Sequence, residues 1–186
     1  MNLFFRLLLV FLRATFSKKN DDVFAETELR SRVMLTDQDM FAHMTNSRYF
    51  SFSDLATINY IIRTGYWPKL RKAGWVPVVA AESVTFARTL KAHQAFVIKT
   101  RLQGWDERYI CLEHNFIRNG KQTARVRSIA RFASRRKGKS VTMADVMNLL
   151  GVERPSPALP EPYQRLIEDI QADRAAPAEE VENGGR

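Results

Sequence analysis

Two acidic residues and a histidine lie close together just ahead of a predicted helix. Asp37, Asp39 and His43 are followed by Asn46, a residue type that favours the N-cap position of a helix. The first amides of a helix have no intrahelical acceptor, and this end carries the positive side of the helix dipole. An oxygen that gains negative charge in a reaction is stabilised at such a place, and Asp39 is near enough to act as a general base or a nucleophile. The segment therefore predicts catalysis.

A structural interpretation of the same residues also stands. Aspartates at strand-to-helix turns commonly accept hydrogen bonds from backbone N–H groups, and Asp39 in that role is only a cap. Of the two carboxylates we assign the chemistry to Asp39 and a turn or supporting role to Asp37.

Residues 36–49 also match a family pattern. They read T-D-Q-D-M-F-A-H-M-T-N-S-R-Y, which resembles the D-x-D-x-x-x-H-[MV]-[TN]-N-[SA]-x-Y signature of hotdog-fold acyl-CoA thioesterases of the 4-hydroxybenzoyl-CoA thioesterase type. From about Arg30, through Gly-Trp-Asp at Gly104, to Val152 the chain most resembles the branch that contains thioesterase superfamily member six. The resemblance implies hydrolysis of a thioester to a carboxylic acid and coenzyme A, with no metal or redox cofactor.

The resemblance also implies roles for single residues. Asp39 attacks the thioester or activates water, and the amides around Ala42 and His43 form the oxyanion hole. Many relatives have Gly in place of Ala42, whose methyl group restricts a positive φ. His43 either orients Asp39, binds substrate or makes a structural hydrogen bond. We also assign Asn46, as a cap rather than a catalyst, and Tyr49 to the substrate side, and the resemblance places Arg88 near the entrance for pantetheine or phosphate.

Two further expectations concern partners and activity. Relatives bury their active sites between two subunits, which implies a homodimer or a dimer of dimers. The branch with the strongest resemblance is less clearly catalytic than the enzymes of the fold. The leading alternative is therefore a non-catalytic acyl-CoA or lipid-binding protein at a membrane surface, followed by a membrane-surface scaffold.

Size and charge limit the possible partners. The chain has 186 residues and a formal net charge of +9, a length that favours one well-cored domain. Residues 153–186 hold eight acidic and four basic residues, which leaves +13 on the rest. A basic body favours nucleic acid, acidic lipid headgroups or a phosphorylated ligand such as coenzyme A. The single Cys111 excludes an internal disulfide and is expected to be an inert core thiol. It suits either a reducing compartment, and we expect the cytoplasm, or a fold that needs no disulfide.

Residues 1–19 predict an amphipathic, membrane-associated helix. Leu, Phe and Val dominate the segment, and a narrow polar stripe is expected from Asn2, Arg6, Arg13 and Ser17. The arginines leave too short an apolar run to cross a bilayer, and the segment lacks a small-x-small cleavage pattern, so we expect it to be retained. Lys18 and Lys19 suit an anionic membrane surface. The alternative is a helix that packs on the domain or on a partner subunit.

The remaining pattern predicts an α+β fold. Strands are expected at 27–36, 76–87, 95–104, 108–118 and 121–134, with an Asn-Gly hairpin between the last two. A long helix is expected from 46 to about 64 and shorter helices at 142–150 and 163–172, while 66–75 is expected to be a connection with a short helical turn. This order predicts an antiparallel sheet wrapped around one helix, and the resemblance implies the same hotdog fold. Residues 27–152 then form the domain, and 153–186 form a Pro-rich linker, short helix and loose tail.

The last strand predicts one packed and one basic face. Arg125, Arg127 and Arg131 alternate with apolar residues. We expect them to join Arg135, Arg136, Lys137 and Lys139 in a patch that holds coenzyme A phosphates through charge-assisted hydrogen bonds, although a solvated strand face explains any single arginine equally well.

Other chemistries lack their usual patterns. No RNP-type alternation of aromatic and basic residues supports RNA binding, so nucleic acid is not an expected partner. No Walker or GxGxxG sequence is present. His43, His93 and His114 fall in different predicted elements, without the close spacing of a metal site, and we expect no metal.

Overall fold

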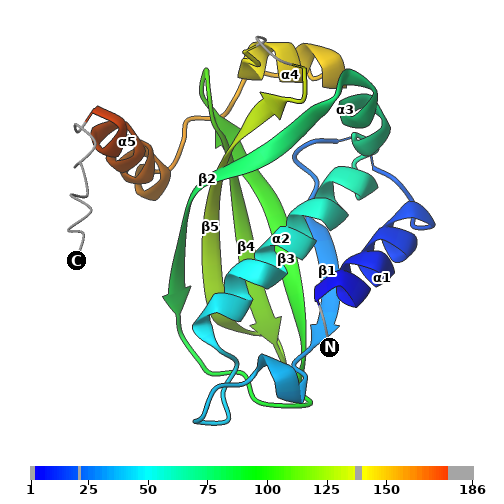
Figure 1. The fold of residues 1–186 in the computed structure, drawn as a ribbon, viewed down its shortest axis with the longest axis vertical. Coiled ribbons are helices and arrows are strands. Elements are labelled where there is room, and N and C mark those ends of the chain that lie inside the picture. Colours follow the sequence, from blue (N-terminus) through cyan, green and yellow to red (C-terminus); the bar gives the residue numbers. More distant parts are fainter. Residues whose placement is uncertain (1–2, 21, 137–139, 176–186) are drawn as a thin grey trace, which may run out of the picture.

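The structure is a computed structural model and describes residues 3–20, 22–136 and 140–175. The helices and strands follow the predicted order (Figure 1). They are α1 (Leu3–Thr15), β1 (Thr27–Arg32), the 3-10 turn Leu35–Asp37, α2 (Asn46–Arg63), α3 (Trp67–Ala73), β2 (Trp75–Phe86), β3 (Ala95–Trp105), β4 (Ile110–Arg118), β5 (Lys121–Ser134), α4 (Met143–Leu150) and α5 (Glu161–Ala175). Asn2, Lys137, Lys139 and the predicted tail from 176 lie outside the described residues.

In the described part of the chain, five strands form one antiparallel sheet in the order β1-β3-β4-β5-β2. The sheet curves around α2, which lies along its concave face (Figure 1). The predicted α+β hotdog architecture is confirmed. Because β2 pairs with β5 alone, one edge of this twelve-residue strand has no partner within the described chain.

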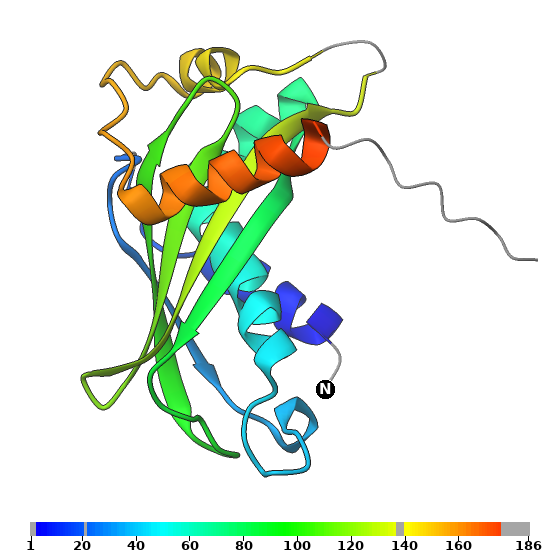
Figure 2. The same cartoon turned by 90° about the vertical axis from the view of Figure 1, so that its left-hand side faces the viewer.

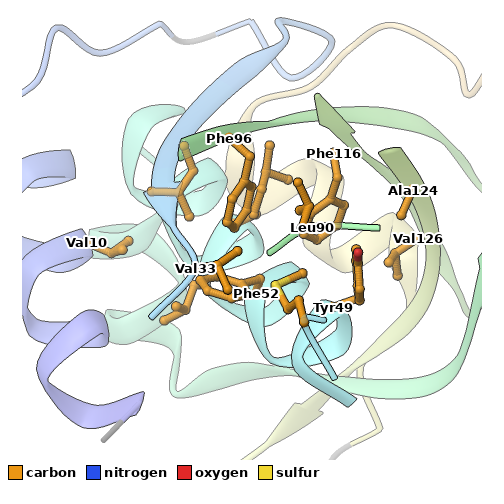
Figure 3. Close-up of a cluster of buried hydrophobic side chains, with 14 residues drawn as sticks. Val10, Val33, Tyr49, Phe52, Leu90, Phe96, Phe116, Ala124 and Val126 are labelled. Atoms are coloured by element: carbon orange, nitrogen blue, oxygen red, sulfur yellow. The ribbon is translucent and has the colours of Figure 1, made fainter. Parts of the chain in front are cut away.

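The core between α2 and the sheet is aromatic near the start of the helix. Phe52 meets Phe96 edge to face at 5.1 Å between ring centroids, and Phe96 stacks on Phe116 at 5.8 Å (Figure 3). These rings are almost fully buried, and such pairs add to the stabilisation that burial provides. The core thereby fixes the first turns of α2.

Helix α5 covers part of the opposite face of the sheet (Figure 2). Tyr163, Ile167 and Ile170 bury Cys111 and Ile129 there, and burial raises the pKa of the Cys111 thiol to about 12. Cys111 is thus a core thiol that stays protonated at neutral pH.

Helix α1 packs on α2 with one narrow stripe. Arg6, Val10 and Ala14, each four residues apart, are its buried residues. Arg6 therefore points into the protein, whereas the apolar residues of α1 are largely exposed. This is the reverse of the sequence prediction, in which Arg6 belongs to a polar stripe on the outer side of the helix. No described helix has the length and apolar character needed to cross a membrane.

Candidate functional site

A pocket of about 330 Å³ opens where α2 begins and β2 ends. It is lined by Asp39, His43, Met44, Asn46, Tyr49, Phe86, Ala87, Arg88 and Thr89. Five residues predicted for the site, namely Asp39, His43, Asn46, Tyr49 and Arg88, therefore meet in one cavity. Its size falls within the range of small-molecule sites.

The segment 39–43 is a tight loop held by Asp39. The backbone N–H of Asp39 donates to the carbonyl oxygen of His43 at 2.9 Å, and the N–H of Ala42 donates to the carbonyl oxygen of Asp39 at 3.1 Å. The Asp39 Oδ1 accepts from the N–H groups of Phe41 and His43 at 2.9 and 3.2 Å. One carboxylate oxygen thus serves as a turn cap, as the structural interpretation of the sequence expects.

The second carboxylate oxygen has a different environment. Oδ2 of Asp39 accepts no hydrogen bond from the described residues, and the side chain is exposed at the pocket. Two apolar residues form the tip of the loop, Met40 at 91% and Phe41 at 71% exposure. Asp39 therefore has one oxygen that fixes the loop and one that can reach a ligand.

Ala42 has a left-handed backbone conformation, with φ of 58°. This conformation costs an alanine roughly 1–2 kcal/mol, whereas glycine adopts it freely. Its carbonyl oxygen also accepts from the Gln38 amide at 2.6 Å. Since the Ala42 and His43 N–H groups both have acceptors within the loop, they can bind a substrate oxygen only if the loop rearranges.

The backbone N–H groups at the start of α2 make fewer hydrogen bonds than those of the Asp39 loop. The helix begins at Asn46, and the preceding cap position is held by Thr45 rather than by Asn46 as expected. The shift has a local cause, because the Thr45 N–H is bound to the Asp37 carbonyl oxygen at 2.9 Å. Within the described chain, the N–H groups of Asn46 and Ser47 have no acceptor, as is usual for the first turn of a helix.

Tyr49 and Arg88 form two walls of the pocket. The Tyr49 ring is buried against Phe86 and Phe116, with centroids 5.0 and 5.1 Å away, and burial raises its pKa to about 12. The exposed Arg88 donates to the Gln122 carbonyl oxygen at 2.9 Å. Tyr49 is mainly a core residue with an edge in the pocket, while Arg88 supplies a cation at its rim.

The other predicted arginines lie elsewhere. Arg135 follows β5 beside Gly74, next to the Trp75 end of β2, whereas Asp39 and Arg88 lie at the Phe86 end. The length of β2 separates these ends by roughly 36 Å. Arg125 pairs with Glu113 at 3.4 Å. Within one chain, Arg135 and Arg136 do not reach the Asp39 pocket.

Two clusters around carboxylates, a buried one at Asp37 and a half-buried one at Glu82, were not predicted. The carboxylate of Asp37 is 1% exposed and lies 2.5 Å from the Arg6 guanidinium and 3.4 Å from that of Arg48. It also accepts from the Met34 N–H at 2.8 Å. The cluster links α1 to the segment that carries Asp39.

The second cluster surrounds Glu82 on β2. This carboxylate accepts hydrogen bonds from the hydroxyls of Ser128 and, at 2.9 Å, Ser53. Burial raises the pKa of Glu82, the two hydroxyls oppose this rise, and the charge of Asp54 adds to it. In the sequence, Glu82 is a single acidic residue within a mostly apolar strand, and this pattern was the available indication of a shielded carboxylate.

The three histidines remain apart. His114 is fully buried between the hydroxyls of Thr100 and Thr57, at 2.9 and 3.4 Å. His43 lies in the loop and His93 in an exposed turn. Among the residues that the structure describes, no three His, Cys, Asp or Glu side chains are grouped as a metal site.

Comparison with known proteins shows which family this chain resembles. Residues 33–150 match the Thioesterase-like superfamily. Protein THEM6 of Danio rerio is 35% identical over 114 residues, which are 61% of this chain and 56% of that protein. Protein THEM6 of Xenopus laevis is 31% identical over 114 residues, 61% of this chain and 55% of the relative. The chain thus spans little more than half the length of these relatives.

Solved structures share the fold at low identity. The 4-hydroxybenzoyl CoA thioesterase from Pseudomonas sp. strain CBS-3 superposes with a TM-score of 0.59 and 19% identity, covering 67% of this chain and 98% of that one. The probable thioesterase YbaW from Escherichia coli gives a TM-score of 0.61 with 15% identity over 66% of this chain and 95% of the other. At such identities the likeness concerns the fold.

Proposed function

The chain belongs to the Thioesterase-like superfamily, and from this premise we propose that it hydrolyses an acyl-CoA thioester to a carboxylic acid and coenzyme A. The proposal depends on one observation: Asp39, Arg88 and Asn46, the first residue of α2, line a single pocket, and the Asn46 N–H has no acceptor within the described chain. A carboxylate, hydrogen-bond donors for an oxyanion and a cation for phosphate are the groups that this reaction needs.

Asp39 is the proposed reacting group. As a general base, Oδ2 takes a proton from water while the water oxygen attacks the thioester carbon. As a nucleophile, Oδ2 attacks that carbon itself and forms a mixed anhydride, which water then opens. In both routes the carbon–sulfur bond breaks and the coenzyme A thiolate leaves. The Oδ1 bonds to Phe41 and His43 hold the carboxylate in place for either route.

The N–H groups of Asn46 and Ser47 are the preferred oxyanion donors. They have no acceptor in the described structure and lie at the positive end of α2, where negative charge is stabilised. The amides of Ala42 and His43, which the family resemblance favours, serve only after the loop bonds break. His43 then has a structural role, because its backbone closes the Asp39 loop.

A homodimer completes the phosphate site in this proposal. The free edge of β2 carries exposed Val78 and Val79, and an unpaired edge strand of this length favours pairing with another strand. Two-fold pairing of antiparallel β2 strands sets the Trp75 end of one against the Phe86 end of the other. Arg135 of the partner subunit and Arg136 of the partner subunit then approach Arg88, where together they bind the phosphates of coenzyme A.

We also propose that α1 contacts an anionic membrane. Its outward face exposes Phe4, Phe5, Leu8, Leu9 and Leu12, and Phe16, just after the helix, is 86% exposed. Apolar patches of this kind on a basic helix are typical of interfacial helices. The protein then works as a peripheral membrane protein.

One observation favours the alternative of acyl-CoA binding without turnover. Asp39 and two of the amides near it are bonded to each other, as they are in a loop that serves only as a structural turn. In that case the pocket holds the ligand and no bond is broken.

Release of free coenzyme A thiol from a panel of aliphatic and aromatic acyl-CoAs distinguishes the two. The wild type is expected to release thiol, and Asp39→Asn to lower kcat by about 10²–10⁴-fold. The matched control Asp173→Asn, on the exposed side of α5, should keep full activity. Equal rates for Asp39→Asn and the wild type refute the catalytic role, and calorimetric binding without thiol release supports the binding protein.

A further inference from the structure

A second pocket, rich in arginine, lies between α1 and the edge strand β1. Its volume is about 370 Å³, and it shares no lining residue with the Asp39 pocket. The lining is Arg6, Leu9, Val10, Arg13, Leu29, Arg30, Ser31, Arg32, Met34, Leu55 and Ala95. We infer that this arginine pocket binds the phosphate of an anionic phospholipid while α1 rests on the membrane.

The charges of the pocket call for an anion. Arg6 is neutralised by Asp37, but Arg13 and Arg30 form no ion pair with any described residue. Arg32 donates to the uncharged carbonyl oxygen of His93 at 2.9 Å, so its charge is also uncompensated. No acidic side chain contributes to the lining within the described chain. Guanidinium groups bind phosphate oxygens through charge-assisted hydrogen bonds.

The walls of the same pocket are apolar. Leu9, Val10, Leu29, Met34 and Leu55 line it together with the arginines. A small hydrated anion gains nothing from such walls, because apolar burial stabilises only apolar atoms. Cations beside hydrocarbon match a ligand in which phosphate is joined to an aliphatic part, as it is in a phospholipid.

The outer face of α1 continues into the pocket. Phe5, Leu9 and Arg13 are spaced four residues apart and form one ridge of the helix. Phe5 and Leu9 are 57% and 45% exposed, and Leu9 and Arg13 line the pocket. When the apolar face enters the acyl region of a bilayer, this ridge brings Arg13 to the depth of the phosphates. Lys18 and Lys19, both exposed, follow the helix and add attraction to anionic lipid.

This inference rests on the proposed membrane contact of α1 and is independent of hydrolysis. Acyl-CoA also joins phosphates to an apolar chain, but its proposed site is the Asp39 pocket, which shares no lining residue with this one. A phospholipid accounts for the arginines, the apolar walls and the exposed ridge together.

Vesicle cosedimentation of the full chain tests the inference. Wild-type protein should bind vesicles of phosphatidylcholine mixed with phosphatidylglycerol at least about tenfold more tightly than phosphatidylcholine alone. The double variant Arg13→Gln/Arg30→Gln should lose about tenfold of that affinity. Its charge-matched control is Arg165→Gln/Arg174→Gln on α5, at the opposite face of the sheet (Figure 2), which should bind nearly as the wild type. Thermal melting checks that both variants fold.

The outcomes separate the possible ligands. Equal losses in the two double variants overturn the site, because only net charge then matters. Displacement from vesicles by free coenzyme A or inorganic phosphate, with no preference for anionic lipid, assigns the pocket to a soluble phosphate and also overturns it. Hydrolysis of acyl-CoA is measured without vesicles: if Arg13→Gln/Arg30→Gln keeps it, a failed lipid preference leaves the thioesterase proposal intact.

Discussion

The guanidinium of Arg6 lies 2.5 Å from the carboxylate of Asp37, although 31 residues separate them. Both side chains are buried, and the Arg6 guanidinium also lies 4.7 Å from the centroid of the Phe52 ring. The carbonyl oxygen of Asp37 in turn accepts from the Thr45 N–H at 2.9 Å. Helix α1 is therefore part of the support for the loop that carries Asp39.

Removal of this cation should destabilise the protein strongly. Arg6→Met leaves the buried Asp37 with only its weaker partners, and the loss of one member of a buried ion pair costs about 3 kcal/mol. Chemical denaturation measures the free energy of unfolding. Arg13→Met, on the exposed side of the same helix, is the control and should change it by less than about 0.5 kcal/mol.

The double variant Arg6→Met/Asp37→Asn completes a mutant cycle. Because the neutral pair leaves no buried charge, the double variant should be less destabilised than the sum of the single changes. Simple additivity of the two effects contradicts a direct Arg6–Asp37 interaction.

The left-handed backbone of Ala42 offers a stabilising change. Ala42→Gly removes the steric cost of φ near 58° but adds conformational freedom to the unfolded chain, so we expect a net gain of about 0.5–1 kcal/mol. Ala92→Gly is the matched control, because its φ is not positive, and it should lose stability. A loss in both variants shows that the loop relaxes in solution.

Local patterns predicted the elements well. Period-two alternation and the Asn119–Gly120 turn located β4 and β5, since these signals depend on neighbours in the chain. The cap of α2 was predicted one residue late, because Thr45 is fixed by a bond to Asp37. The Asp39 pocket followed from a resemblance over contiguous residues, which carries the relative positions of Asp39, Asn46 and Tyr49.

Tertiary relationships were harder to predict. Nothing near Arg6 in the sequence indicates that it turns inward to meet Asp37. Arg88 and Arg135 both looked suitable for phosphate, yet the antiparallel pairing of β2 with β5 places them at opposite ends of the strand. The hydrogen-bonded cluster of Glu82 was not predicted because its partners, Ser53 and Ser128, come from two other elements.

Buried His114 should make stability depend on pH. Burial lowers its pKa from 6.5 to about 3, so between these values the unfolded chain binds a proton that the folded chain does not. The free energy of unfolding therefore falls as pH falls through this window, by about 1.4 kcal/mol per pH unit from this group. Above pH 6.5 the group contributes no pH dependence.

Denaturation curves from pH 7.5 down to about pH 4 compare the wild type with His114→Gln. The two should run parallel above the window and diverge within it, the variant losing less stability on acidification. The exposed His93 provides the control His93→Gln, whose curve should follow the wild type. Identical slopes for His114→Gln and the wild type rule out the predicted linkage.

Gly104 should tolerate no side chain. A Cβ there would lie 2.9 Å from Oγ of Ser156 and 3.0 Å from both Leu159 Cδ2 and the Pro157 carbonyl oxygen. Ser156 also accepts from the Trp105 N–H at 2.7 Å, so displacement of this segment costs a hydrogen bond as well. We expect Gly104→Ala to lower the free energy of unfolding by about 2–3 kcal/mol.

Gly120 is the control that separates the steric clash at Gly104 from the cost of a positive φ. It also has a positive φ, at 71°, but a Cβ there meets nothing within 4 Å. Gly120→Ala should therefore cost only the backbone strain, about 1 kcal/mol. Equal losses in the two variants assign the effect at Gly104 to its backbone alone.

The free edge of β2 should control assembly and activity together. Val79 is 48% exposed on this edge strand, and Val79→Lys places a charge where two β2 strands would meet, a common means of preventing edge pairing. Sedimentation equilibrium should show a dimer for the wild type and a monomer for Val79→Lys, with reduced thiol release because Arg135 of the partner subunit is lost. Leu12→Lys, at an exposed position of α1, should stay dimeric in the absence of membranes. If Leu12→Lys dissociates and Val79→Lys does not, the subunits meet through α1, and a phosphate site shared across β2 is refuted.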